Sequence, residues 1–117
     1  MERIDRVVRA LPLKPGKEQA FRELAAEMKR RRSRTRDFFG KYGVVRESWH
    51  LQRAPDGSFM VIGITEAPKI RAVAKRYGAS ADETDAWLKG RIHELTGVDL
   101  DQQPLGPPTE TVFDWKA

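Results

Sequence analysis

The sequence predicts an α+β protein of the ferredoxin-like class, with a four-stranded antiparallel sheet and helices on one of its faces. Two observations lead to this prediction. Residues 44–65 contain two β-rich runs on either side of Ala-Pro-Asp-Gly, a composition typical of a β-hairpin. Helical apolar periodicity appears both before and after this hairpin. The resulting order of strand, helix, strand, strand, helix pair and strand is that of a split βαβ sandwich, βαββ(αα)β.

The first strand and the first helix are predicted over residues 5–13 and 17–38. Alternation along the strand places on one side Val7, Arg9, Leu11 and Leu13. The helix carries one apolar stripe, formed by Phe21, Leu24, Ala25 and Met28. Arg32 falls close to the centre of this stripe, since each residue turns the helix by about 100°. We therefore expect Arg32 either to reach solvent beyond the sheet or to meet a buried acceptor.

Two helices and a last strand are predicted after the hairpin. The first of these helices covers residues 68–77, and its apolar face contains Ile70, Val73, Ala74 and Tyr77. The second follows Ser80, which has capping-box spacing to Glu83, and ends at Gly97. Residues 111–115 have the composition of a fourth strand.

The later strands carry apolar residues on both faces of the predicted sheet. These residues are Trp49, Phe59, Met60, Val61, Ile62, Ile64, Phe113 and Trp115. A sheet with one solvated face needs fewer. We therefore expect the face without helices to pack against a second copy of the chain, giving a homodimer.

Length and composition favour one soluble domain, residues 1–117. The 117 residues have a mean hydropathy of -0.63 and contain no apolar run of the roughly 20 residues that span a membrane, so no membrane partner is expected. The first residues are too charged for a secretory signal, and cytoplasmic localisation is the expectation. Absence of cysteine excludes thiol chemistry and cysteine-based zinc sites. With two histidines, no metal site is expected.

The net charge of +5 comes from one segment, residues 29–36, which holds six of the 22 basic residues and none of the 17 acidic ones. Such a segment could bind nucleic acid by neutralising phosphates. It lies on a predicted amphipathic helix, lacks interleaved aromatic residues and adjoins no groove-entering motif. A solvated basic helix end is therefore the preferred interpretation, and nucleic-acid binding is the lesser alternative.

Candidate catalytic residues lie on the first arm of the hairpin. Glu47 shares its side of the strand with Trp49, so a buried Glu47 needs a partner, for which Arg32 is the candidate. Glu47 is then a general base or ligand acceptor oriented by Arg32. The alternatives are that the two form a buried structural ion pair or are two exposed charges. His50 lies on the opposite side, where it is either a general base in a polar wall or part of a solvated or interface-facing surface.

Candidate substrate-binding residues are Arg32, Trp49, Asp85 and Trp87. The two tryptophans either line a ligand pocket or belong to the core or an interface. Asp85 lies two residues before Trp87, and its position in the first turn of a helix, where the helix dipole favours an acid, is one explanation for it.

The chain resembles the dimeric α/β-barrel superfamily, which includes the antibiotic-biosynthesis monooxygenases, and within it an uncharacterised bacterial family. The resemblance covers nearly the whole chain, through LKPGKEQAF, the arginine-rich stretch near residues 29–32, ESWHLQ with the following Asp-Gly turn, and DAWLK. It implies two copies packed sheet against sheet, with a pocket between each sheet and its helices or inside the shared barrel. For Asp85, the resemblance implies a position that faces the same pocket as Trp87. Haem-degrading members use an Asn, Trp and His constellation, and this chain contains no asparagine.

The functional hypothesis is a small-molecule-binding protein that acts as a cofactor-independent monooxygenase or cyclase on an aromatic or planar metabolite. Such chemistry needs a water-excluding pocket with aromatic walls and one or two titratable groups. The alternative is a non-catalytic ligand-binding or structural module with the same fold. Because successive residues on a strand point to opposite faces, Glu47 and His50 are not expected to form one catalytic pair.

Overall fold

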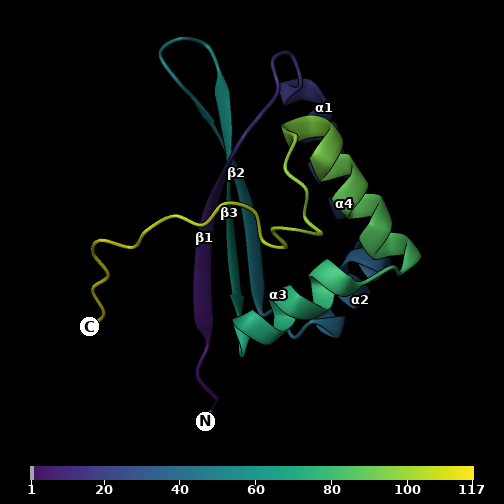
Figure 1. The fold of residues 1–117 in the computed structure, drawn as a ribbon, viewed down its shortest axis with the longest axis vertical. Helices are drawn as coiled ribbons and strands as arrows, with labels where there is room; N and C mark the ends of the chain where they lie inside the picture. The colour runs from purple at the N-terminus through teal and green to yellow at the C-terminus, as the bar shows by residue number, and fades with distance from the viewer. Residues whose placement is uncertain (1) are drawn as a thin grey trace.

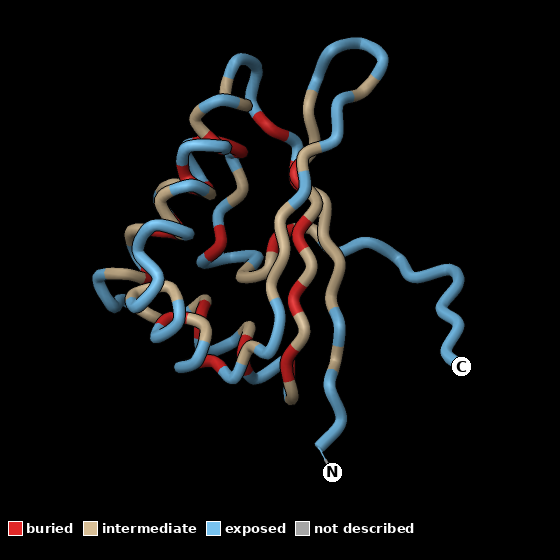
Figure 2. Tube along the Cα trace, turned by 180° about the vertical axis from the view of Figure 1, so that it is seen from behind, coloured by how far each residue is buried: buried red, intermediate tan, exposed pale blue. Residues whose placement is uncertain are grey.

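The computed structural model describes residues 2–117 as an α+β fold in which one antiparallel sheet is covered by helices on one face only (Figures 1 and 2). Its elements are β1 (Asp5–Pro12), α1 (Glu18–Arg30), α2 (Arg32–Lys41), β2 (Arg46–Arg53), β3 (Phe59–Ala67), α3 (Ile70–Ala79) and α4 (Glu83–Thr96). The strand order is β1-β3-β2. No helix in the described part of the chain is both long and apolar enough to cross a membrane.

The predicted hairpin is present and forms two of the three strands. Strands β2 and β3 pair antiparallel, and β1 pairs with the other edge of β3. On the helix-covered inner face, one cross-strand row contains Arg9, Gly63 and Trp49. Glu47 shares this face, whereas His50 lies on the uncovered outer face. The prediction that Glu47 and His50 belong to different faces is confirmed.

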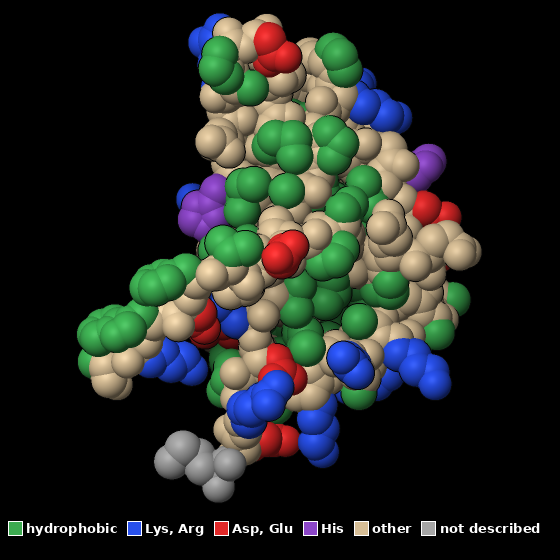
Figure 3. Space-filling model, turned by 60° about the vertical axis from the view of Figure 1, so that its left-hand side comes forward, with side chains coloured by type: hydrophobic (Ala, Val, Ile, Leu, Met, Phe, Trp, Pro, Cys, Tyr) green, Lys and Arg blue, Asp and Glu red, His purple; other side chains and the backbone are tan. Residues whose placement is uncertain are grey.

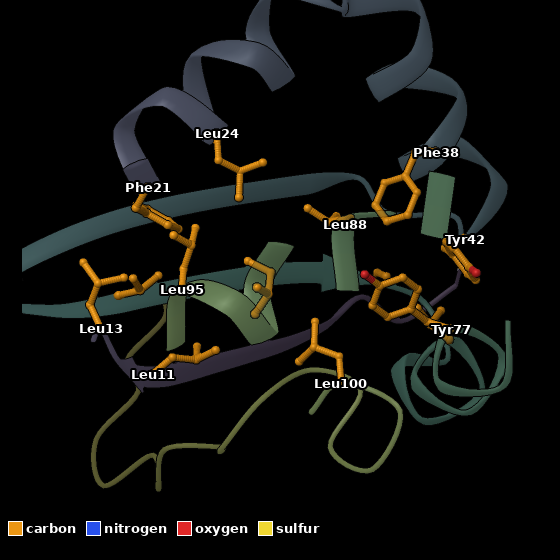
Figure 4. Close-up of a cluster of buried hydrophobic side chains, with 14 of the residues drawn as sticks. Leu11, Leu13, Phe21, Leu24, Phe38, Tyr42, Tyr77, Leu88, Leu95 and Leu100 are labelled. Atoms are coloured by element: carbon orange, nitrogen blue, oxygen red, sulfur yellow. The ribbon is translucent and has the colours of Figure 1, made fainter. Parts of the chain in front are cut away.

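The core lies between the inner sheet face and the four helices (Figure 4). Leu24 of α1 and Leu95 of α4 are its largest fully buried apolar side chains. Six further core residues lie at apolar positions of helical periodicity: Phe21, Ile70, Val73, Tyr77, Leu88 and Ile92. Helical and strand periodicity therefore located the core, because each element has one face that must leave water.

The single helix predicted over residues 17–38 is two helices, which separate at Arg31. The backbone of Arg31 has φ -93° and ψ 59°, outside helical values. The Thr35 hydroxyl donates to the carbonyl oxygen of Met28 at 2.7 Å, and this bond satisfies an acceptor left free by the break. The break changes the phase of the helix, so Phe38 faces the core while Arg32 is exposed.

Helices α3 and α4 lie within about two residues of their predicted ranges. Gly97 follows the last residue of α4 with φ 79°, and its amide donates to the carbonyl oxygen of His93 at 2.8 Å, so the predicted end is confirmed. The predicted capping box is wrong. The residue that precedes α4 is Asp82, no side-chain hydrogen bond caps this end, and Glu83 is the first helical residue instead of the third.

The predicted fourth strand over residues 111–115 is not formed. After α4, the chain turns back toward the sheet and meets the free edge of β1 (Figure 1). There Arg9 pairs with Pro108, and the Thr109 amide donates to the carbonyl oxygen of Val8 at 2.8 Å. No further backbone hydrogen bond joins residues 110–117 to β1. This tail carries apolar side chains that are largely exposed: Val112 (84%), Phe113 (83%) and Trp115 (73%).

Candidate functional site

A cavity of about 90 Å³ lies between the inner sheet face and the helices. Its sheet side is formed by the row Arg9, Gly63 and Trp49, together with neighbouring apolar residues. Its other walls come from an aromatic group on α2 and α3, from α4, and from the segment over residues 98–106 that follows α4. The cavity is thus an apolar space with a small polar group on one side.

The polar group is an ion pair between Arg9 and Glu47, whose side chains are 13% and 9% exposed. Nη2 of Arg9 donates to Oε2 of Glu47 at 2.9 Å, and Nη1 donates to the Thr65 hydroxyl at 2.5 Å. Thr65 donates in turn to Oε1 of Glu47 at 2.5 Å, and the Trp49 indole donates to Oε2 at 2.8 Å. Both carboxylate oxygens are therefore occupied by donors, as a buried charge requires.

Gly63 makes this ion pair possible. Arg9 on β1 and Glu47 on β2 flank the central strand β3, so the guanidinium must pass over β3 at Gly63. A Cβ atom at Gly63 would lie 2.9 Å from Cζ of Arg9, closer than carbon atoms pack. The absence of a side chain here lets the arginine lie flat against the sheet.

A second buried polar group surrounds Asp85, which is fully buried at the first turn of α4. Tyr42 donates to Oδ2 of Asp85, and Nζ of Lys41 donates to Oδ1 at 2.9 Å and to Asp82 at 3.0 Å. Burial alone would raise the pKa of Asp85, but hydrogen bonds from Ser80, Tyr42 and Lys41 outweigh it and lower the pKa. Asp85 is therefore ionised and paired.

Tyr77 of α3 lies between these two polar groups. Its ring makes edge contacts with the rings of Phe38 and Tyr42, at centroid distances of 5.7 and 5.6 Å. Its hydroxyl is buried and has no hydrogen-bond partner among the described residues. Figure 4 shows this hydroxyl pointing into the middle of the core cluster. Burial, with smaller contributions from nearby acidic groups, raises the pKa of Tyr77 well above its ordinary value.

Two of the predicted site residues, Glu47 and Trp49, lie on the cavity wall. The Trp49 ring also packs against Phe21, with centroids 5.7 Å apart. Asp85 does not line the cavity, although its partner Tyr42 does. The expected pairing of Arg32 with Glu47 is wrong: Arg32 is exposed at the start of α2, and the partner of Glu47 is Arg9.

The remaining predicted residues lie elsewhere. Trp87 stands on the side of α4 that faces α1 and α2, where the Arg34 guanidinium covers its ring at 4.9 Å. His50 is exposed on the outer sheet face, with Nε2 3.0 Å from the Ser48 hydroxyl. Sequence reasoning missed Arg9 and Tyr77 as site residues. Arg9 had a usable signal, because it is a charged residue among Val7, Leu11 and Leu13 on the apolar side of a strand.

The chain matches no protein-family model and no curated protein. Within residues 2–117, no three His, Asp or Glu side chains lie close enough together to hold a metal ion. The chemical character of the cavity is set by the residues that line it, namely apolar walls and the ion pair of Arg9 and Glu47.

Gly63→Val is expected to destabilise the protein by about 2 to 4 kcal/mol, because the new side chain displaces Arg9 and leaves the buried Glu47 carboxylate without its cation. Valine is favoured in strands, so backbone preference does not explain a loss. Urea denaturation measures the effect. The cost should be smaller in an Arg9→Met background, and an equal cost in both backgrounds would contradict the role given to Gly63.

Asp85→Asn is expected to cost about 2 to 3 kcal/mol at neutral pH, because charge-assisted bonds to Lys41 and Tyr42 are lost. The pKa of Asp85 is lower in the folded protein than its ordinary value of 3.8. Its stabilisation is therefore present above pH 3.8 and lost as pH falls through the folded pKa. Denaturation midpoints measured from pH 7 down to acid should fall less steeply for the variant, and the exposed control Asp114→Asn should follow the wild type.

Proposed function

We propose that the chain is a small-molecule-binding protein whose ligand occupies the cavity between the inner sheet face and the helices. The observation that carries this proposal is an apolar cavity whose wall contains the buried ion pair of Arg9 and Glu47. Apolar cavities with a few convergent polar groups are the usual form of a ligand site. A purely structural core would be expected to fill this space, since protein interiors are close-packed.

The size of the cavity limits the ligand. Drug-sized ligands occupy pockets of about 300 to 1,000 Å³, and an apolar cavity of about 150 Å³ accepts benzene. At about 90 Å³, the cavity suits a ligand of at most one ring. A larger planar metabolite requires movement of a wall, and the wall with the least regular structure is the segment over residues 98–106.

We favour ligand binding over catalysis at Glu47. A general base must have a lone pair within reach of the substrate proton. Glu47 already accepts three hydrogen bonds and is paired with Arg9. In this state it orients Arg9, Thr65 and Trp49 around the cavity. A cofactor-independent monooxygenase or cyclase reaction remains the second proposal, supported by the aromatic wall and by the resemblance to the dimeric α/β-barrel superfamily.

Glu47→Gln separates the two proposals. In a binding protein, the variant should bind small aromatic probes such as benzene and phenol about tenfold more weakly, because Trp49 and Arg9 lose an anionic acceptor. Isothermal titration measures this, with the exposed tail variant Glu110→Gln as control. In an oxygenase, oxygen uptake with hydroquinone should occur in the wild type and disappear in Glu47→Gln. Absence of saturable binding of any single-ring probe to the wild type would refute the cavity proposal.

We also propose a homodimer through the outer sheet face. No helix covers this face, and its central rows contain Val8, Ala10, Ile62 and Ile64. Figure 3 shows hydrophobic side chains on this side of the molecule and on the arm that projects from it. The tail over residues 110–117 offers a second apolar surface to the same partner. In the dimer, residues 111–115 would supply the fourth strand of a ferredoxin-like sheet.

Ile64→Lys should convert the dimer to a monomer, because it places a charge in an apolar interface that buries at least about 1,200 Å². Light scattering at micromolar concentration measures the mass. Circular dichroism shows whether the variant is folded, and Lys75→Glu on exposed α3 serves as the control. A monomeric wild type would count against the dimer.

Nucleic-acid binding through residues 29–36 is the least favoured proposal. Part of the basic charge in this segment already has local partners: Arg31 lies 3.2 Å from Glu27, and Arg36 lies 3.8 Å from Asp37. Arg34 covers Trp87. These contacts support a solvated, partly neutralised helix end.

A further inference from the structure

We infer that the ligand of this cavity is an uncharged, planar compound of about one ring that carries a hydroxyl or carbonyl oxygen, and that this oxygen accepts a hydrogen bond from Tyr77. The inference rests on the proposed ligand-binding function and adds the chemical class of the ligand. Three features of the cavity lead to it: an unpartnered donor, balanced charges and small size.

The Tyr77 hydroxyl is the unpartnered donor. The residue is 7% exposed, and the hydroxyl oxygen has no hydrogen-bond partner in the described chain. Buried hydroxyl groups are normally bonded, because burial removes them from water. A buried hydroxyl without a partner in the chain, on the wall of an apolar cavity, therefore points to an acceptor atom of a ligand.

The tyrosine ring is held in place, so the hydroxyl cannot turn to solvent. Its edge contacts with Phe38 and Tyr42 fix the ring from the α2 side. Nζ of Lys89 donates to the Tyr77 carbonyl oxygen at 3.1 Å and lies 5.4 Å from the ring centroid. The hydroxyl consequently stays directed at the core, as Figure 4 shows.

The hydroxyl is a donor at neutral pH. Burial is the main reason that its pKa is raised, and the negative charge of Asp85 adds to the effect. The group therefore keeps its proton, and the complementary ligand atom is an acceptor oxygen.

The other uncharged side-chain donors described above are already used. The hydroxyls of Thr65 and Tyr42 donate to Glu47 and Asp85, and the Trp49 indole donates to Glu47. Among these side-chain donors, Tyr77 is the one that remains for a ligand. A single polar contact combined with apolar walls suits a ring with one oxygen substituent.

Charge balance excludes an ionic ligand. Arg9 is paired with Glu47, and Lys41 is paired with Asp85. No unpaired charge among these four groups remains to compensate an anion or a cation that leaves water, and such a loss of solvation is costly. An uncharged compound enters without this penalty.

Phenol, toluene and benzoate test the inference, because they are similar in size and differ in the oxygen and the charge. The wild type should bind phenol about tenfold more tightly than toluene, the ratio that corresponds to one hydrogen bond of about 1.4 kcal/mol. Benzoate should bind at least about tenfold more weakly than phenol. Dissociation constants come from titrations followed by amide NMR shifts.

Tyr77→Phe is the decisive variant, since it removes the hydroxyl and keeps the ring. It should abolish the preference for phenol while toluene binds as before, and its thermal midpoint should not fall, because the lost hydroxyl had no partner. Thr109→Val removes a hydroxyl outside the cavity, bonded to the Val8 carbonyl oxygen, and should preserve the preference.

The outcomes separate this inference from the proposed function. Equal binding of phenol and toluene to the wild type, an unchanged preference in Tyr77→Phe, or benzoate binding as tight as phenol binding overturns the inference alone. Failure of all three probes to bind the folded wild type overturns the cavity proposal and this inference with it.

Discussion

The ion pair between Arg9 and Glu47 is the constraint on which the inner face of the sheet depends. It joins the two outer strands across the central one, and it requires a glycine at position 63 for the guanidinium to pass. Breaking such a pair by removing one charge is far more costly than forming it is favourable. The pair therefore fixes the relative position of β1 and β2, and with it the shape of the cavity wall.

The polar group around Asp85 likewise joins two separate elements, at the other end of the core. Asp85 holds α4 to the end of α2 through Lys41 and Tyr42. Both buried carboxylates thus accept several hydrogen bonds, whereas the hydroxyl of Tyr77, which lies between them, has no hydrogen-bond partner in residues 2–117. In this core the charged groups are paired, and one neutral hydroxyl has no partner. Such an arrangement favours a ligand that offers one hydrogen-bond acceptor and carries no charge.

Sequence patterns predicted the hairpin, the helices on one sheet face, and that Glu47 and Trp49 share one side of their strand while His50 lies on the other, because strand alternation and helical periodicity are local properties. They left open which of these two sides faces the helices. They did not predict that Arg9 pairs with Glu47, since strand order decides which residues meet across β3. The helix break at Arg31 depends on how α1 and α2 cover the core. The missing strand over residues 111–115 shows that strand composition alone does not supply a pairing edge.

The segment over residues 98–106 is both a wall of the cavity and the only connection from α4 to the tail. It packs closely against its neighbours at two glycines, where there is no room for a side chain. A Cβ atom at Gly78 would lie 2.6 Å from Pro104, and one at Gly106 would lie 3.3 Å from Leu11. Its Asp101 is tied to Lys89 at 2.6 Å. The segment that carries the tail is therefore also a packed part of the cavity wall. If a second copy of the chain bound the tail, the free energy of opening the cavity would include the free energy of that binding. Ligand entry and dimer formation would then be thermodynamically linked.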